Sequence, residues 1–231
     1  MRIAVVGAGG FVGQRLVRVL AGRGDDVVAL SSSQGLFDPR SGGLVGTLPR
    51  TERLDALIYL AQSPHFRDVP ARADHVWGVN VAAAMTAAEW ARRAGATRLI
   101  YTSTGNVYHP GFEPHRESDS VRRDDWYALS KVHAEEALRL LAVPRATILR
   151  LFGVYGPGQR GRLIPSLIQS VFRGAPVRLQ PHPLNTFDVG GLRLGVTYID
   201  DVIRIILRAL GDEMPPRSEE HTSELQSHSF I

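Results

Sequence analysis

Residues 1–13 read MRIAVVGAGGFVG, and this stretch decides the fold. Residues 3–6 form a short run of apolar, mostly β-branched side chains, as expected for a buried strand. Gly7, Gly10 and Gly13 follow with the spacing G-x-x-G-x-x-G, and an amphipathic run continues from there. The pattern predicts a glycine turn between a first strand and a first helix.

Such a turn suits the pyrophosphate of a dinucleotide. Gly7 lets the chain turn off the strand, Gly10 lets the backbone approach the phosphates, and Gly13 lets the helix pack close to the strand. The helix N-terminus then offers free N–H groups and a partial positive charge to the anion. A glycine-rich turn without a ligand is the alternative for this motif taken alone.

Composition narrows the class of protein. The chain has 231 residues, enough for one substantial domain or one domain with a small appendage. It contains no Cys, which excludes disulfides and thiolate metal sites, and no cluster of side chains has metal-ligand spacing. The formal net charge of +4 is spread over many Arg, without a basic block typical of nucleic-acid binding. No stretch resembles a membrane span or a signal peptide, so we expect a cytoplasmic protein that binds neither nucleic acid nor membrane.

Strand-like and helix-like segments alternate along the first 151 residues. After the first helix, strands are expected at 27–31, 54–61, 98–103 and 146–151, with a weaker one at 44–48. Helices are expected at about 71–94, ending before Gly95, and at about 125–141. This alternation predicts an α/β fold: a doubly wound, Rossmann-like parallel sheet with helices on both faces.

The pattern changes after Phe152, where Gly and Pro become dense and strands shorten. We expect a helix at 163–173, a short strand at 177–179, and a strand at 196–199 with a helix at 200–210 that return to the main sheet. The expected domains are a dinucleotide-binding domain at 1–152 and 192–211, a partial substrate lobe at 153–191, and a tail at 212–231.

A second motif, YALSK, places Tyr127 and Lys131 four residues apart and therefore on one helix face. A phenol with a pKa of about 10 is a poor acid or base at neutral pH. A neighbouring ammonium stabilises the phenolate, so we expect Lys131 to lower the pKa of Tyr127. A surface Tyr and Lys on an ordinary helix is the alternative.

A third motif, YTSTGNVY at 101–108, ends a central strand with Ser103 and Thr104. Ligands bind at the carboxyl ends of strands in such sheets, where a hydroxyl can bind a substrate oxygen. Hydroxyls that merely cap the strand end are the alternative.

Together these segments resemble the extended short-chain dehydrogenase/reductases of the NAD-dependent epimerase/dehydratase family. The matches cover about residues 1–210 in the family's order. They are GAGGFVG (7–13), LIYLAQS (57–63) where the family has H-L-A-A, Val79-Asn80, TSTGNVY (102–108), YALSK (127–131), RLFGVYGPGQ (150–159) and YIDDV (198–202).

The resemblance implies roles for individual residues. Tyr127 would be the catalytic acid/base, Lys131 would hold the nicotinamide ribose, and Thr104 would supply the hydroxyl on the substrate. Asn80 would support the lysine through water. Residues implied to contact the cofactor are Gly7, Gly10, Phe11, Val12, Gly13, Ser31, Ser32, Ala61, Gln62, Tyr127, Lys131 and Phe152, with Ala61 and Gln62 acting through backbone.

The implied activity is an NAD(P)-dependent epimerase or reductase on a nucleotide-sugar-like substrate. Tyr127 would move a proton at a substrate hydroxyl while hydride passes to or from the nicotinamide. A homodimer through helices of the dinucleotide domain is a further expectation. A catalytically silent NAD(P)-binding regulator or sensor, or an inert truncated fragment, are the alternatives.

Several positions depart from the family pattern. The acidic residue that ends the second strand and binds the adenosine ribose is absent, and Ser31 and Ser32 stand there, so NAD and NADP both remain open. Gly105 follows Thr104 where 4,6-dehydratases have Asp, which argues against elimination chemistry. Arg193, one place off the family position, is either a ligand of a substrate pyrophosphate or a solvated side chain.

The last segment, RSEEHTSELQSHSF at 217–230, lacks any strand or helix pattern. It looks like the in-frame translation of a sequencing-library adapter. We therefore expect it to lie outside the fold, and the native chain to continue into the rest of a substrate lobe.

Overall fold

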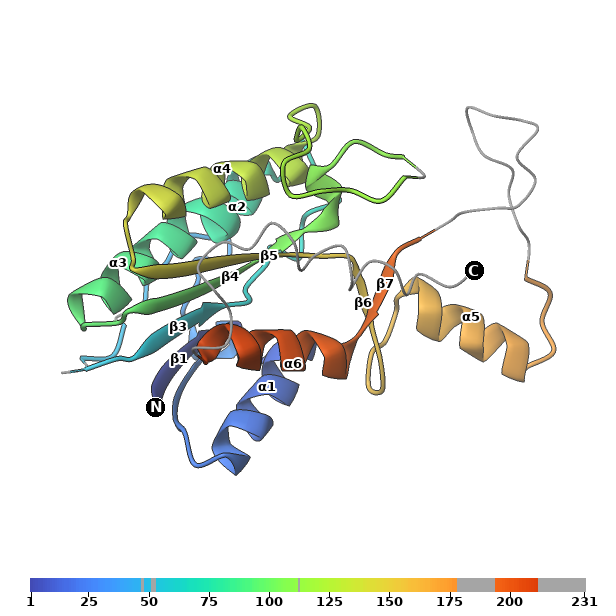
Figure 1. Cartoon of the computed structure of the whole chain (residues 1–231). Coiled ribbons are helices and arrows are strands. Elements are labelled where there is room, and N and C mark those ends of the chain that lie inside the picture. Colours follow the sequence, from blue (N-terminus) through green and yellow to red (C-terminus); the bar gives the residue numbers. More distant parts are fainter. Residues whose placement is uncertain (47, 51–52, 112, 178–193, 212–231) are drawn as a thin grey trace.

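The computed structural model describes residues 1–46, 48–50, 53–111, 113–177 and 194–211 (Figure 1). Its centre is a five-stranded sheet with the order β2-β1-β3-β4-β5, in which every neighbouring pair is parallel. The strands are β1 (Arg2–Val6), β2 (Asp26–Leu30), β3 (Ala56–Tyr59), β4 (Arg98–Thr104) and β5 (Arg145–Leu151). The chain leaves β1 for β2 and then returns to β3 on the other side, so a crevice forms at the carboxyl end of β1.

Helices cover both faces of this sheet (Figure 1). One face carries α1 (Phe11–Gly22) and α6 (Ile199–Leu210), and the other carries α2 (Ala73–Trp77), α3 (Ala83–Arg93) and α4 (Trp126–Leu140). The predicted doubly wound α/β fold is confirmed. Among the described residues, no helix is both long and apolar enough to span a bilayer.

Alternation along the strands builds two cores. Ile3 and Val5 of β1 pack toward α1 and α6, whereas Ala4 and Val6 face the α3 side. Because side chains point to opposite faces with a period of two, a strand covered on both sides reads as a continuous apolar run. The α3 side is lined by small residues, which let the helix approach the sheet: Ala83, Ala84, Ala87, Ala88 and Ala91 are all buried.

The helix expected at 71–94 contains a π-helical turn, Gly78–Ala82, between α2 and α3. Tyr59 Oη donates to the carbonyl of Val79 at 2.5 Å, and Tyr101 Oη donates to the carbonyl of Asn80 at 3.0 Å. These bonds satisfy carbonyls that a regular helix would pair internally. A Cβ at Gly78 would lie 1.7 Å from the carbonyl oxygen of Ser41, so only glycine fits there. The turn places Asn80 in the interior.

Two expected strands differ from the structure. The weak strand at 44–48 is a single bridge between Phe37 and Leu44. The strand at the start of the final segment, β7 (Val196–Tyr198), does not return to the main sheet: it pairs in parallel with β6 (Gly153–Tyr155). β6 follows β5 after one residue but turns away from the main sheet. β7 therefore pairs with β6 and does not join the sheet beside β5. The helix α6 does return, as expected.

The segment of β6, β7 and α5 (Leu163–Phe172) projects from the carboxyl end of β5 (Figure 1). No residue of α5 is buried, and its large apolar side chains include Val171 and Phe172, which are 70% and 87% exposed. Of the expected elements here, the strand at 177–179 lies outside the described residues except for Val177, which is not in a strand. The tail at 212–231 lies outside them altogether.

Candidate active site

The glycine turn after β1 is shaped by close backbone packing. Gly7 has a φ of +91°, and a Cβ there would lie 2.7 Å from the amide nitrogen of Ala61. A Cβ at Gly13 would lie 2.2 Å from the carbonyl oxygen of Gly7. Gly10, the N-cap of α1, offers no side-chain cap, and the first turn of α1 has no acidic residue. The N–H groups of this helix end are therefore open to an anion.

The end of β2 lies beside this turn and is uncharged. Ser31 Cβ is 3.3 Å from the position that a Cβ at Gly9 would take. The hydroxyls of Ser31 and Ser33 are hydrogen-bonded at 2.6 Å, and Ser32 begins a short 3₁₀ turn. The next carboxylate along the chain, Asp38, accepts N–H groups within its own turn, and these bonds lower its pKa.

Tyr127 lies in the first turn of α4, where Asp125 caps the helix by accepting the N–H of Ala128 at 2.8 Å. The Tyr127 side chain is buried, and its ring packs on Phe66 with the centroids 5.3 Å apart. Its hydroxyl donates to Gln62 Oε1 at 3.0 Å. Burial raises the pKa of Tyr127 to about 12, and the side chain of Thr104 opposes this rise.

Lys131, one turn further along α4, is fully enclosed. Its Nζ donates to the carbonyl of Thr102 at 2.9 Å and lies 4.8 Å from the ring centroid of Tyr101. Burial lowers the pKa of Lys131 to about 7, and the carboxylate of Glu135 opposes this shift.

The expectation that Lys131 lowers the pKa of Tyr127 is therefore wrong for the arrangement in this structure. The groups that lower it are Thr104 and Arg162, and burial outweighs both. The physical reason is that the Lys131 amine is directed at Thr102 and Tyr101, while its own burial disfavours its charge.

Asn80 ties three segments together in the interior. Its Nδ2 donates to Ser130 Oγ at 2.9 Å, and its Oδ1 accepts the N–H of Ser63 at 3.3 Å. Ser130 Oγ in turn donates to the carbonyl of Tyr127 at 2.8 Å. Asn80 thus links the π-helical turn, the loop after β3 and α4. Its expected link to Lys131 through water stays a prediction.

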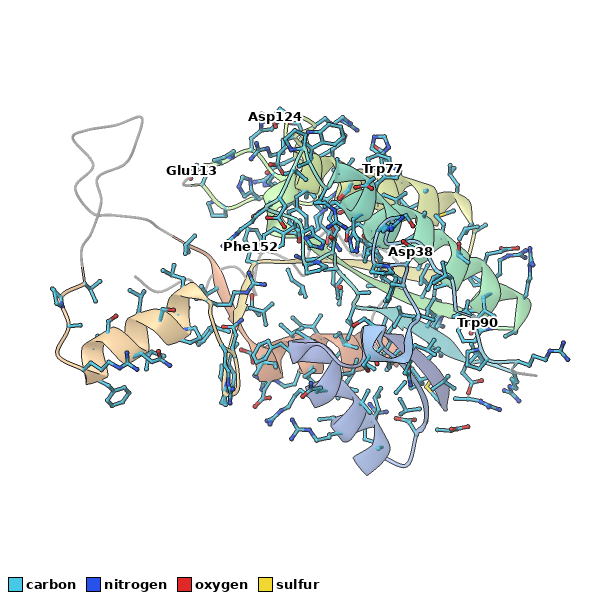
Figure 2. All side chains as sticks on the ribbon, turned by 180° about the vertical axis from the view of Figure 1, so that it is seen from behind. Asp38, Trp77, Trp90, Glu113, Asp124 and Phe152 are labelled. Carbon is cyan, nitrogen blue, oxygen red and sulfur yellow. The ribbon has the colours of Figure 1, made fainter. Side chains whose placement is uncertain are left out.

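Thr104 ends β4 and accepts the N–H of Asn106 at 3.2 Å. The next residue, Gly105, lies against Phe152, and a Cβ at Gly105 would be 2.5 Å from the Phe152 ring. Figure 2 shows Phe152 where the sheet gives way to the segment of β6, β7 and α5. Phe152 therefore occupies the space that a side chain at position 105 would need.

Sequence reasoning missed Glu135. Its carboxylate is 1% exposed and accepts bonds from Ser103 Oγ at 2.5 Å and from Arg150 at 2.7 Å. Arg150 also donates to Tyr108 Oη at 2.9 Å. The available signal was spacing, because Tyr127, Lys131 and Glu135 recur every four residues on one face of a helix.

The structure thus brings Thr104, Gln62, Tyr127 and Lys131 together at the carboxyl ends of β3 and β4. Ala61 joins this cluster to the glycine turn through its contact with Gly7. Arg193 lies outside the described residues. Among the described residues, no group of His, Asp or Glu is arranged to hold a metal ion.

A doubly wound parallel sheet with a glycine turn after its first strand defines a Rossmann-like α/β protein. The sequence matches the model of the NAD dependent epimerase/dehydratase family over residues 3–220, and the chain belongs to this family.

Three individual proteins to which the chain is similar share 25–30% sequence identity with it. Sterol-4-alpha-carboxylate 3-dehydrogenase, decarboxylating, from Mus musculus is 26% identical over 188 residues, covering 75% of this chain and 51% of the relative. dTDP-4-dehydrorhamnose reductase from Mycobacterium tuberculosis is 30% identical over 163 residues, covering 68% and 51%. The solved structure of MoeE5 in complex with UDP-glucose and NAD has a TM-score of 0.74 at 25% identity, covering 94% and 74%. The chain spans about half the length of the curated relatives it matches.

Proposed function

We propose that this protein is an NAD(P)-dependent epimerase or reductase that acts on a nucleotide-sugar-like substrate. The observation that carries the proposal is the cluster of Thr104, Tyr127 and Lys131 beside the glycine turn. An acid/base, a hydroxyl and an amine at the carboxyl edge of a Rossmann-like sheet are the groups that a hydride-transfer site needs.

The residues present fit a dinucleotide. The close packing of Gly7 and Gly13 and the uncapped start of α1 form a cradle for a pyrophosphate, with Gly10, Phe11 and Val12 at the open helix end. Ser31 and Ser32, which follow β2 beside the turn, would hold the adenosine ribose. Ala61, Gln62, Lys131 and Phe152 would line the nicotinamide half. When bound, the nicotinamide supplies the hydride chemistry.

Tyr127 handles the proton. With a pKa raised to about 12 by burial, its hydroxyl is protonated at neutral pH and ready to donate to a carbonyl oxygen of the substrate. Thr104 supplies a second hydroxyl to orient that oxygen. In the opposite direction Tyr127 takes the proton from a substrate hydroxyl, which requires the phenolate to be stabilised within the site.

The packing of Phe152 on Gly105 bears on the type of reaction. The 4,6-dehydratases of this family are expected to have a carboxylate directly after the residue that matches Thr104. The same chemistry here would require room for a side chain at position 105. The Phe152 ring fills that space, which favours epimerisation or reduction. The relatives include a reductase of a dTDP-sugar and a protein solved with UDP-glucose and NAD, which supports a nucleotide-sugar substrate.

A homodimer through the helices of the dinucleotide domain and a cytoplasmic location remain part of this proposal. They would be checked by the mass of the protein in solution and by its distribution between cell fractions.

The test is turnover of UDP- and dTDP-hexoses with NAD(H) and NADP(H) by wild type and Tyr127→Phe. We expect Tyr127→Phe to reduce kcat by ~100-fold or more, with the cofactor Kd changed less than about threefold, because the ring stays and only the hydroxyl that carries the transferable proton is lost. Tyr155→Phe, a change at an aromatic pair away from the cluster, is the control. A wild type that binds cofactor but turns over no nucleotide sugar would favour the silent cofactor-binding protein.

A further inference from the structure

We propose that Gln62 is a catalytic residue of this site: its side-chain carboxamide binds the Tyr127 hydroxyl in both of its protonation states. The proposal rests on the function proposed above, in which Tyr127 is the acid/base. It assigns to the Gln62 side chain a role beyond the backbone contact with a cofactor that the sequence suggests.

The first support is the contact itself. Tyr127 Oη donates to Gln62 Oε1 at 3.0 Å. Tyr127 is 8% exposed whereas Gln62 is exposed, so the carboxamide meets the phenol from the open side of the site. This is the side from which a substrate oxygen must reach the same hydroxyl.

The second support is the chemistry of the carboxamide. It carries an acceptor oxygen and a donor NH₂ group on the same terminal carbon, and it rotates about a soft torsion. Its oxygen accepts from the neutral phenol, as in this structure. After a half-turn its nitrogen donates to the phenolate. Gln62 thus gives Tyr127 a partner before and after proton transfer, whereas an Ala at this position would end at Cβ and not reach the phenol.

The third support is that the chain on both sides of Gln62 is held in place. Ser63 is 1% exposed; its N–H donates to Asn80 Oδ1, and its hydroxyl is hydrogen-bonded to His75 Nδ1 at 2.8 Å. That hydroxyl also accepts the N–H of His65 at 3.1 Å. On the other side, Ala61 packs against Gly7. A side chain that starts from a fixed backbone meets its target with little reorganisation.

The charged and titratable groups around Tyr127 come from several elements. Arg162, at the start of α5, lowers the pKa of the phenol, and Asp125, at the start of α4, raises it. Burial raises the pKa of Tyr101 in β4, and the electrostatic interaction with Tyr127 raises it further. None of these groups is changed by a substitution at position 62. A change in the NMR signal of Tyr127 or in the pH profile of a Gln62 variant therefore reports on Gln62.

The contact is tested without catalysis by NMR of protein carrying ¹³Cζ-labelled tyrosine, with the Tyr127 signal assigned by its loss in Tyr127→Phe. We expect Gln62→Leu, which keeps the bulk and removes the amide, to move the Tyr127 signal at neutral pH. Gln169→Leu, at an exposed glutamine of α5, leaves the signal in place. An unmoved signal in Gln62→Leu would overturn the proposal.

The catalytic role is tested by steady-state kinetics in both directions. We expect Gln62→Leu to lower kcat by about 10- to 100-fold, with substrate KM and cofactor Kd within about threefold of wild type. Gln62→Glu keeps an acceptor but loses the donor and adds a negative charge. The phenolate of Tyr127 is therefore harder to form. In the direction in which the phenolate takes a proton from the substrate, we expect the pH of half-maximal rate to rise by about one unit or more. Gln169→Glu leaves this profile unchanged.

Four outcomes would refute the catalytic role. A Gln62→Ala enzyme faster than wild type would show that the amide competes with substrate for the phenol. Normal kcat in Gln62→Leu would show that the contact is not used. A wild type without turnover, or full activity in Tyr127→Phe, would refute the proposed function and this role with it, while the NMR signal still reports separately on the contact.

Discussion

The two halves of the candidate site are held by different forces. The glycine turn is fixed by close steric fit, because at Gly7 and Gly13 an added methyl group would overlap backbone atoms. The cluster around α4 is held by buried polar bonds, in which Lys131, Glu135 and Asn80 each find a partner. A change in the turn should therefore act on packing and cofactor binding. A change in the cluster should act on buried charge, and thus on rate and pH dependence.

The largest expected effect lies in the charged half. Glu135→Ala leaves Arg150 and Ser103 without their buried acceptor, and we expect the free energy of unfolding to fall by about 3–5 kcal/mol. Glu136→Ala is the matched control, since its ion pair with Arg123 is half exposed; it should change stability by less than ~1 kcal/mol. Urea denaturation of both variants measures the difference, and equal losses would show that burial of Glu135 is unimportant.

The next effect tests the half that is fixed by close steric fit. Gly13→Ala forces a methyl group to within 2.2 Å of the Gly7 carbonyl oxygen, so we expect a loss of about 1–3 kcal/mol in stability and weaker NAD(P)H binding. Gly22→Ala, in the same helix, meets nothing within 4 Å and should raise stability by up to about 1 kcal/mol. Thermal unfolding and cofactor fluorescence titration compare the two. A Gly13→Ala protein with wild-type stability and affinity would contradict steric control of the turn.

A third effect concerns pH. Lys131 is the only lysine of the chain, so ¹³Cε-lysine labelling yields a single NMR signal, which should titrate near pH 7. Because the pKa is lower in the folded protein, the unfolded state holds more protons between about pH 7 and pH 10. The contribution of Lys131 therefore makes stability rise with pH across that window, by at most about 1.4 kcal/mol per pH unit. Lys131→Met should remove this slope; a signal that titrates near pH 10 would refute the effect of burial.

The smallest effect lies at the outer edge of the turn, where Ser31 and Ser33 share a hydrogen bond. Ser31→Asp places a carboxylate beside the glycine turn, where it can bind a ribose hydroxyl but repels a 2′-phosphate. We expect the ratio of NADPH to NADH dissociation constants to rise by ~10-fold. Ser33→Ala is the control. A ratio that does not move would place the adenosine ribose elsewhere.

Much of the candidate site could be anticipated because its residues lie in local patterns. Gly7, Gly13, Tyr127 and Lys131 occupy positions where turn geometry or helix spacing is set by neighbours in the chain. The partners of these residues could not be anticipated in the same way. The contact of Gln62 with Tyr127 spans 65 positions, and that of Lys131 with Thr102 spans 29.

The sequence by itself determined the doubly wound sheet, because side-chain periods of two and 3.6 residues identify strands and helices wherever burial is regular. It also predicted that Thr104, Tyr127 and Lys131 lie at the carboxyl edge of the sheet. Only the tertiary structure decided how they are poised: the amine of Lys131 directed at a carbonyl, the phenol of Tyr127 bound by Gln62, and β7 paired with β6. The physical reason is that burial and hydrogen-bond direction depend on segments distant in the chain, whereas periodicity depends on its neighbours.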